Sequence, residues 1–288
     1  MTIAQAIQSA LTLGLAQLDA QLLLLHLLGK PPVERAWLLA HDQDVLDPAI
    51  VGQFTANVLR CLGGESVAYI TGHKAFYGLD LAVDRRVLVP RPDTETLVQW
   101  ALEMLACLPD RATPPDVLDL GTGSGAVALA IKHSNPNARV SATDISEDAL
   151  AVARANTLNL KLEVSFSRGS WLNGISGRYD LIVSNPPYIA EKDPHLAALA
   201  HEPLQALTSG ADGLDAIRDI IEQAPAHLHA DGWLLLEHGF DQATNVRELL
   251  VAAGFRDVQC RRDLAGIERC SGGRWNDRDH AVLKKKET

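Results

Sequence analysis

The residues best suited to chemistry are Asn185, Pro186, Pro187 and Tyr188, which follow an apolar run that ends at Ser184. A strand that ends in an asparagine and two prolines leaves an amide oxygen and main-chain carbonyls that no following ladder can use. A planar NH2 group fits such an edge. The Asn185 oxygen and the Pro186 carbonyl can accept its two hydrogens, while the Tyr188 ring covers its face. The pattern therefore predicts a catalytic site that holds an amide or amino nitrogen.

A glycine-rich turn comes earlier in the chain, between a predicted strand at residues 117–120 and a predicted helix at 126–133. Its glycines let the backbone pass close to a ligand, and the helix N-terminus presents free N–H groups. NAD, FAD, S-adenosylmethionine (SAM) and a turn without ligand are all compatible with it. NAD sites usually follow G-x-G-x-x-G, whereas the third glycine here comes two positions after the second, which favours SAM. This predicted cofactor loop consists of Gly121, Thr122, Gly123, Ser124 and Gly125.

Three side chains outside the cofactor loop could complete a SAM site. Asp144, 23 positions after Gly121, ends the second predicted strand, where a carboxylate can accept hydrogen bonds from both ribose hydroxyls. It could instead cap the helix that begins near Ser146. Asp119 could hold the ammonium group of SAM, directly or through water. Trp171 could stack on the adenine or belong to the core.

The composition narrows the choice of partners. A net charge of −10 and a pI near 5.4 argue against a protein that grips nucleic acid by its phosphates. The four cysteines form no CxxC pair and have no histidine at ligand spacing, so neither disulfides nor a metal site is expected. The apolar run at 22–28 is interrupted by His26 and is too short to span a bilayer, and no basic residue precedes Lys30. We expect a cytoplasmic monomer that contacts neither membrane nor nucleic acid.

The chain divides into three predicted parts. Residues 1–72 have helical periodicity without strand signals, which predicts a small helical domain that docks substrate. Its three basic and six acidic residues exclude a DNA-reading domain. Residues 73–90 contain short extended pieces joined at Gly78, which predict a β-hairpin linker. Residues 91–288 form the main domain, in which Asp93 is expected to cap the first helix.

The main domain alternates strands with helices, which predicts an α/β fold with a Rossmann-like seven-stranded sheet and helices on both faces. Strands are expected at residues 117–120, 139–144, 162–166, 180–184, 233–237, 258–262 and 281–284. Helices are expected at residues 126–133, 146–156, 216–227 and 241–253.

Taken together, the motifs resemble those of a known family. The glycine loop, the acidic second strand and the Asn-Pro-Pro-Tyr edge, in this order, are similar to the class I SAM-dependent methyltransferases. The chain more closely resembles the protein-(glutamine-N5) methyltransferases, also called HemK or PrmC. That family modifies the glutamine of the Gly-Gly-Gln motif in class I peptide chain release factors. The segments that carry the resemblance are Pro90-Arg-Pro-Asp-Thr-Glu95, Leu118-Asp-Leu-Gly-Thr-Gly-Ser-Gly125, Val183-Ser-Asn-Pro-Pro-Tyr-Ile189, Asp193-Pro-His-Leu196, Glu202-Pro203 and Leu236-Glu-His-Gly239.

The resemblance implies a class I methyltransferase sheet, SAM as the methyl donor, S-adenosylhomocysteine as product, and a release factor as partner, with an effect on translation termination. The residues that it implies for SAM are Gly121 to Gly125, Asp144, Trp171 and Asn185. Those that it implies for the release factor are Asn185, Pro186, Pro187, Tyr188, Arg91 and Glu202. Two departures from the family pattern concern the site. Ser170 replaces an acid that many relatives place next to the adenine, and Ala200-His201 replace an Arg-Phe pair in a slightly longer loop.

Other interpretations stay open. An adenine-N6 or guanine-N2 nucleic-acid methyltransferase could hold a flipped base in the same way, although a basic recognition region is missing. A SAM-binding sensor without catalysis is a second alternative. The Asn-Pro-Pro-Tyr edge alone could also be a rigid turn or a docking peptide. No general base is obvious: Glu237 and His238 end the fifth predicted strand, and a histidine there is more simply a satisfied core residue.

Overall fold

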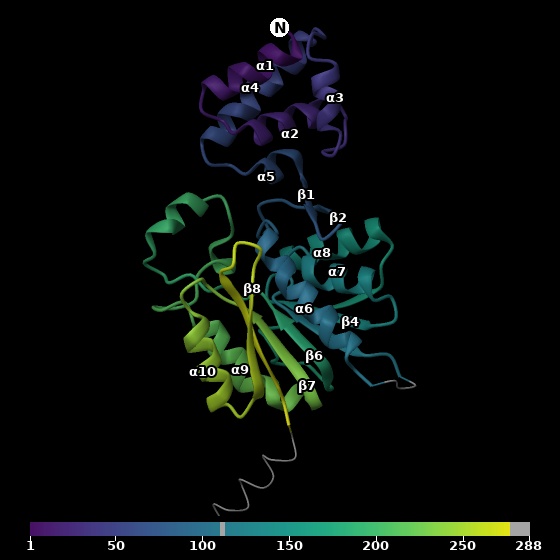
Figure 1. Cartoon of the computed structure of the whole chain (residues 1–288), viewed down its shortest axis with the longest axis vertical. Coiled ribbons are helices and arrows are strands. Elements are labelled where there is room, and N and C mark those ends of the chain that lie inside the picture. Colours follow the sequence, from purple (N-terminus) through teal and green to yellow (C-terminus); the bar gives the residue numbers. More distant parts are fainter. Residues whose placement is uncertain (110–112, 277–288) are drawn as a thin grey trace, which may run out of the picture. The chain divides into compact units, whose positions relative to one another are not determined.

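The computed structural model describes residues 1–109 and 113–276 of the 288-residue chain. Figure 1 shows its helices and strands. The described residues form two compact units. The first unit comprises Met1–His73 together with Ala197–His201, and the second comprises the rest of the described chain from Lys74 onward.

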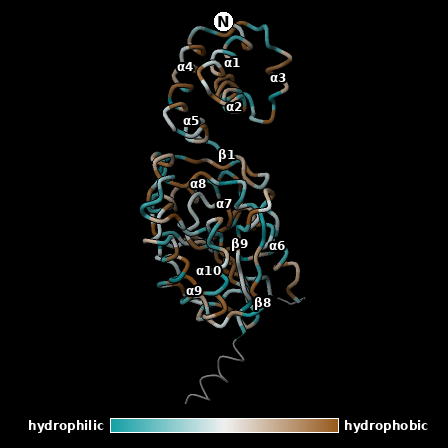
Figure 2. The backbone as a smooth tube through the Cα atoms, turned by 60° about the vertical axis from the view of Figure 1, so that its left-hand side comes forward, coloured by the Kyte–Doolittle hydropathy of each residue, from teal (hydrophilic) through white to brown (hydrophobic). Residues whose placement is uncertain are grey.

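The first unit is built from short helices. They are α1 (Ile3–Thr12), α2 (Gln17–Leu27), α3 (Arg35–Ala40), α4 (Pro48–Leu62) and α5 (Val67–Thr71). Hydrophobic and hydrophilic residues both occur along them (Figure 2). α1 and α4 bury one face, whereas α2 buries three consecutive leucines, Leu23 to Leu25. Ile3, Leu24 and Phe54 lie in their common core. Asp47 caps α4 by accepting a hydrogen bond from the amide of Ala49 at 2.7 Å.

The hairpin expected after the helical part is present as strands β1 (His73–Phe76) and β2 (Leu79–Ala82). Gly78 takes a φ of +79° in its turn, a conformation that glycine adopts without strain. A 3-10 turn, η1 (Pro92–Thr94), then leads into α6 (Glu95–Ala106). The prediction that Asp93 caps this helix is wrong. Its carboxylate instead lies 3.2 Å from the guanidinium of Arg269, which draws it away from the helix N-terminus.

The second unit is organised around a sheet in the order β5-β4-β3-β6-β7-β9-β8. Its strands are β3 (Asp116–Leu120), β4 (Arg139–Asp144), β5 (Val164–Arg168), β6 (Tyr179–Ser184), β7 (Leu228–Glu237), β8 (Arg256–Arg262) and β9 (Glu268–Arg274). Neighbouring strands from β5 to β7 are parallel, whereas β9 runs antiparallel to both β7 and β8. The chain moves outward from β3 in both directions, so a crevice opens between β3 and β6 at their carboxyl ends.

The seventh strand differs from the sequence prediction. The strand predicted at 281–284 lies outside the described residues, and the sheet contains β9 at Glu268–Arg274 instead. The sequence did not indicate β9, because this strand contains two adjacent glycines and no β-branched residue. A Cβ at Gly272 would lie 2.6 Å from the Leu234 carbonyl oxygen and 2.9 Å from the Trp100 ring, so close packing against the sheet requires glycine there.

Helices cover both faces of the sheet, as predicted (Figure 1). They are α6, α7 (Ala126–Ser134) and α8 (Glu147–Leu160), then α9 (Asp215–His227) and α10 (Ala243–Ala252); two further 3-10 turns are η2 (Pro194–Leu199) and η3 (Leu204–Ala206). Alternate strand residues enter opposite cores. Val117 packs in the core that contains α6 and α7, whereas Leu118 packs in the core that contains α9 and α10. Burying each such side chain contributes roughly 1.5–3 kcal/mol, which fixes the strand register and with it the crevice.

None of the helices in the described ranges combines the length and the apolar character needed to cross a bilayer.

Candidate active site

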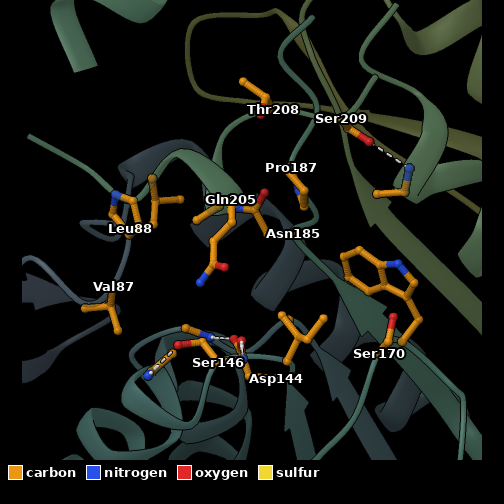
Figure 3. A pocket seen from close by; sticks show the side chains of 18 of the residues that line it. Val87, Leu88, Asp144, Ser146, Ser170, Asn185, Pro187, Gln205, Thr208 and Ser209 are labelled. Carbon is orange, nitrogen blue, oxygen red and sulfur yellow. Dashed lines mark hydrogen bonds between the residues drawn. The ribbon is translucent and has the colours of Figure 1, made fainter. Parts of the chain in front are cut away.

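A cavity of about 420 Å³ lies in the second unit at the carboxyl ends of the parallel strands. Figure 3 shows side chains from several loops converging on it. The residues predicted from the sequence that line it are Gly121, Gly123, Asp144, Trp171, Asn185 and Pro187. The structure therefore brings the cofactor loop, the acidic end of the second strand and the Asn-Pro-Pro edge to one place.

The cofactor loop owes its shape to its three glycines, which have φ values of +67°, +56° and +84° in chain order. Side chains other than glycine are strained in this conformation. Gly125 precedes α7, and a Cβ there would lie 3.0 Å from a methyl carbon of Leu129 and 3.3 Å from Ala153. The amide of Gly123 donates to a carboxylate oxygen of Asp144 at 2.9 Å, which holds the loop at the end of β4.

Asp144 braces two loops with its two oxygens. Oδ2 accepts from Gly123, and Oδ1 accepts from the amide of Ser146 at 2.9 Å. The cap of α8 is Ser146, whose hydroxyl accepts from the amide of Ala149 at 3.2 Å, so Asp144 does not act as the helix cap. Burial raises the pKa of Asp144, while the backbone donors oppose that rise. A carboxylate at the cavity wall can still accept hydrogen bonds from ligand hydroxyls through its remaining lone pairs.

Three predicted cofactor residues are buried: Asp119 in β3, and Thr122 and Ser124 in the cofactor loop itself. Oδ2 of Asp119 accepts from the Thr122 hydroxyl at 2.6 Å and from the amide of Ala128 at 3.2 Å. Burial raises the pKa of Asp119 to about 7, although these two donors favour its charged form. None of these three is among the described residues that line the cavity. Their hydrogen bonds therefore shape the loop without facing the cavity.

Trp171 lies against the cofactor loop. A Cβ built on Gly121 would be 3.3 Å from its ring, so the ring covers the glycine at van der Waals distance. Trp171 also packs against the buried core that contains α9 and lines the cavity, while its stacking on the adenine stays a prediction. Ser170, which departs from the family pattern, lines the cavity beside it.

The Asn-Pro-Pro-Tyr edge begins where β6 ends. The Ser184 hydroxyl donates to the Leu120 carbonyl at 2.7 Å and fixes the end of β6 against β3. Asn185 then turns to the cavity wall, and its Nδ2 donates to the Thr94 hydroxyl at 3.1 Å. Pro187 also lines the cavity, whereas Pro186 is buried.

Tyr188 is held from two sides. Its hydroxyl donates to Oε1 of Glu237 at 3.3 Å, and its main-chain carbonyl accepts from Gln242 at 2.9 Å. Burial is the main reason why the pKa of the Tyr188 phenol is raised. Burial likewise raises the pKa of Glu237 to about 7. Neighbouring His238 is fully buried, with ring nitrogens 2.9 Å from the Gly239 carbonyl and the Ser271 hydroxyl, as expected for a satisfied core histidine.

Arg91 and Glu202, which the family pattern implies for substrate binding, form an ion pair with each other. Glu202 also accepts from the amide of Val89 at 3.2 Å and is only 7% exposed on its side chain, whereas the Arg91 side chain is 37% exposed. This pair ties the segment before η1 to the segment before η3. Neither residue is in the cavity wall formed by the described residues.

Comparisons with known proteins agree with this geometry. Residues 101–253 match the methyltransferase small domain family, and residues 3–72 match the PrmC N-terminal domain family. A release factor glutamine methyltransferase of Bordetella pertussis is 49% identical over 90% of this chain and 95% of its own length. A relative of the same name from Pseudomonas aeruginosa is 48% identical over 90% of this chain and 93% of its own length.

The chain belongs to the release factor glutamine methyltransferase family. The family predicted from the motifs is thus confirmed, and so is the methyltransferase sheet. Among solved structures, a methyltransferase from Pyrococcus furiosus superposes with a TM-score of 0.52 at 21% identity, covering 77% of this chain and 99% of its own. A Thermus thermophilus 16S rRNA N2 G1207 methyltransferase with AdoMet and guanosine has a TM-score of 0.52 at 17% identity, covering 70% and 49%. These two structures share the fold.

Sequence reasoning missed two residues that support the site of this family member. Asn156 is buried; its Nδ2 donates to the carbonyls of Ser124 at 2.9 Å and Ala82 at 3.0 Å, and its Oδ1 accepts from the amide of Ala82 at 2.8 Å. It therefore ties the cofactor loop to the hairpin. Thr94 is the second, through its bond to Asn185. No local pattern marks either residue, because their partners are distant in sequence.

The cavity wall also contains segments that no motif predicted. Residues 86–88 form one part of the wall, residues around η3, from Pro203 to Gly210, form another, and Asp215, Ala216 and Asp219 of α9 contribute as well. Figure 3 shows the Gln205 side chain extending into the cavity from η3. The other departure from the family pattern lies in the first unit, where His201 Nε2 is 3.2 Å from the carbonyl of Gly63.

A cluster of Asp116, Asp180 and His229 brings ligand atoms within 4.8 Å of one another at the opposite end of β3 from the cofactor loop. Its carboxylates are already engaged: Asp116 binds Arg139, and Oδ2 of Asp180 accepts from the amide of Asp116 at 2.8 Å. The expectation of no metal therefore stays a prediction.

Proposed function

We propose that this protein transfers a methyl group from SAM to the side-chain amide nitrogen of the glutamine in the Gly-Gly-Gln motif of class I peptide chain release factors. The observation that carries the proposal is the position of Asn185 on the wall of the cavity that the cofactor loop also lines. In this proposal the backbone and carboxylate groups of this cavity hold the cofactor, and the Asn-Pro-Pro edge holds the amide. Family membership supplies the identity of the substrate.

The cavity suits SAM on three observations. Its volume of about 420 Å³ lies in the range of small-molecule sites. Asp144 presents a carboxylate at the end of β4, where ribose hydroxyls would find an acceptor. Trp171 provides an aromatic wall, and the glycines leave room for close backbone approach. Asp119, buried behind the loop, would act on the ammonium group through the loop or through water. SAM supplies an electrophilic methyl group on a sulfonium.

The Asn-Pro-Pro-Tyr edge would hold the other reactant. An amide nitrogen is a poor nucleophile because its lone pair is delocalised into the carbonyl, so the site must orient it and stabilise the positive charge that develops on it. The Asn185 oxygen and the Pro186 carbonyl can accept its hydrogens and bind more strongly as that charge grows. Pro187, in the cavity wall, would limit the space beside it, whereas Tyr188 lies outside that wall and would support the edge from the core side. We assign the proton released after attack to water.

The first unit would dock the release factor. Several apolar side chains of its helices and loops are exposed and would be available to contact a protein partner. Val33, Leu39 and Val45 are the most exposed of the described apolar residues in this unit, between 71% and 85%. In this proposal the protein works as a monomer in the cytoplasm, without metal and without direct contact to nucleic acid.

The proposal is tested by incubating the protein with radiolabelled SAM and a purified release factor. A matched release factor, whose Gly-Gly-Gln glutamine is replaced by alanine, serves as the control. The expected result is labelling of the first and not of the second. Equal labelling of both would place the methyl group elsewhere, and labelling of DNA or RNA would favour the nucleic-acid alternative.

A further inference from the structure

A glutamine side chain enters the cavity from η3. Gln205 lines the cavity wall, and Figure 3 shows its side chain extending from η3 with the amide group toward the side where Asp144 and Ser146 lie. A glutamine amide offers two hydrogens on its NH2 group and a carbonyl oxygen that accepts. The cavity therefore contains a polar group that belongs neither to the cofactor loop nor to the Asn-Pro-Pro-Tyr edge.

The turn that carries Gln205 is fixed on both sides. Before η3, the buried Glu202 carboxylate accepts from the amide of Val89 at 3.2 Å. After η3, the amide of Ser209 donates at 2.9 Å to the carbonyl of Ile189, the residue that follows the Asn-Pro-Pro-Tyr edge. Neither of these bonds between described residues uses the Gln205 amide. The backbone thus places Gln205 without occupying its polar end.

The side of the cavity toward which the Gln205 amide points offers an acceptor, Asp144. The amides of Gly123 and Ser146 both donate to its carboxylate, so these two backbone donors are already used. The remaining lone pairs of Asp144 accept hydrogens from a ligand and give none. A ribose hydroxyl can donate to Asp144, and its own oxygen can then accept a further hydrogen bond. The NH2 group of Gln205 is a donor for that oxygen.

We propose that Gln205 is a cofactor-binding residue for the nucleoside half of SAM. Its NH2 group donates to a ribose hydroxyl whose own hydrogen is donated to Asp144. The proposal rests on the proposed function for the identity of the cofactor. Gln205 does not contact the reacting methyl group or the glutamine of the release factor, so it contributes to the affinity for SAM and not to turnover.

The matched test replaces Gln205 by methionine, which keeps the length of the side chain and removes its hydrogen-bonding groups. In calorimetry without release factor, Gln205→Met should raise the Kd for SAM about 3- to 10-fold, the scale for loss of one neutral hydrogen bond. Gln205→Glu exchanges the NH2 group for an oxygen that cannot donate, and should weaken SAM at least as much. A Kd of Gln205→Met equal to that of the wild type would overturn the proposal.

The control is Leu204→Ala, on the same turn. Leu204 is 63% exposed and is not among the described residues that line the cavity, so its Kd for SAM should stay within about twofold of the wild type. Equal losses in Leu204→Ala and Gln205→Met would show that the turn matters and the amide does not, which would overturn the proposal.

Nucleoside probes locate the contact within the cofactor. 5′-Methylthioadenosine has the nucleoside and lacks the methionine chain, so Gln205→Met should weaken it by the same factor as SAM. A loss for SAM without a loss for this probe would place Gln205 at the methionine chain and overturn the proposal. Adenosine is then compared with its 2′-deoxy and 3′-deoxy forms. Removing the contacted hydroxyl should cost less affinity in Gln205→Met than in the wild type, because the two partners are coupled. Equal costs for both hydroxyls in the two proteins would exclude the ribose.

Kinetics with a release factor separate this proposal from the proposed function. In Gln205→Met, KM for SAM should rise, while kcat at saturating SAM and KM for the release factor stay within about twofold of the wild type. A raised KM for the release factor with an unchanged Kd for SAM would assign Gln205 to the substrate and overturn the inference alone. A protein that loses SAM affinity in Gln205→Met but does not methylate release factors would support the inference and refute the function. A wild-type protein that does not bind SAM would refute both.

Discussion

The two halves of the active site are built by different means. The cofactor half depends on backbone: glycines with positive φ and amides that donate to Asp144. The amide half depends on side chains, since Asn185 and Tyr188 are each held by another buried side chain. The backbone half admits few substitutions, because side chains other than glycine are strained in its loop. The side-chain half depends on two single partners, the Thr94 hydroxyl and the Glu237 carboxyl group.

The strongest way to separate the two halves is Asn185→Ala. Removing the acceptor should lower kcat roughly a hundredfold or more, the scale for loss of one transition-state hydrogen bond, while SAM affinity stays close to that of the wild type. Asn159→Ala, at an exposed position of α8, is the matched control and should leave both quantities unchanged. Turnover near the wild-type value in Asn185→Ala would remove this residue from the chemistry.

The cofactor half is tested by Gly121→Ala. The added Cβ would lie 3.3 Å from the Trp171 ring in a backbone of φ +67°, so both the loop and the ring must shift. We expect SAM affinity to fall about tenfold, with a strain cost of about 1–3 kcal/mol in stability. Gly266→Ala is the control. Gly266 also has a positive φ, of +80°, but a Cβ there meets no atom within 4 Å, so this change should lower stability without lowering the affinity for SAM. Equal SAM affinity in the two variants would show that the ring contact does not matter.

The amide half should also respond to pH through Glu237. Burial raises its pKa to about 7, and the charged or titratable groups that face it are Tyr188, Arg269, Asp93 and Cys270. Protonation of Glu237 would remove the charged acceptor of the Tyr188 hydroxyl and loosen the Asn-Pro-Pro-Tyr edge, so kcat at saturating SAM should fall about tenfold as pH drops from 8 to 6. In Glu237→Gln, which cannot titrate, kcat should no longer change with pH in this range. A wild-type kcat that does not change across this range would contradict the assignment.

The same group has the opposite effect on folding. The folded state raises the pKa of Glu237 from 4.5 to about 7, so the native protein binds more protons than the unfolded chain in that window. The free energy of unfolding is therefore expected to decrease as pH rises from about 4.5 to about 7, and Asp119 contributes with the same sign. Urea unfolding at several pH values measures this, and Glu237→Gln should flatten the slope. A stability that rises through this window in both proteins would contradict the burial argument.

The smallest expected effect on catalysis is that of Asn156→Ala. This change leaves the carbonyl of Ser124 and the backbone of Ala82 without their partner, which should cost about 1–3 kcal/mol of stability. Because Asn156 acts on the cofactor loop from behind, we expect SAM affinity to fall only a few-fold. Thermal unfolding beside Asn159→Ala gives the comparison, and equal melting temperatures would refute the bridging role.

The sequence allowed prediction of one half more fully than the other. The cofactor loop and Asp144 follow from local spacing, because a strand, a glycine turn and a helix are continuous in the chain. The supports of Asn185 and Tyr188 come from Thr94 and Glu237, 91 and 49 positions away, and no periodicity connects such pairs. Strand β9 was not predicted for a related reason. Its glycines are required by close packing against residues that are distant in sequence.

The most direct test of the central claim is to map the methyl group by mass spectrometry on a release factor that the protein has modified with SAM. The account predicts one methyl group on the side-chain nitrogen of the Gly-Gly-Gln glutamine, absent when the Asn185→Ala enzyme is used. A methyl group on another residue, or the same modification by Asn185→Ala at the wild-type rate, would contradict the account.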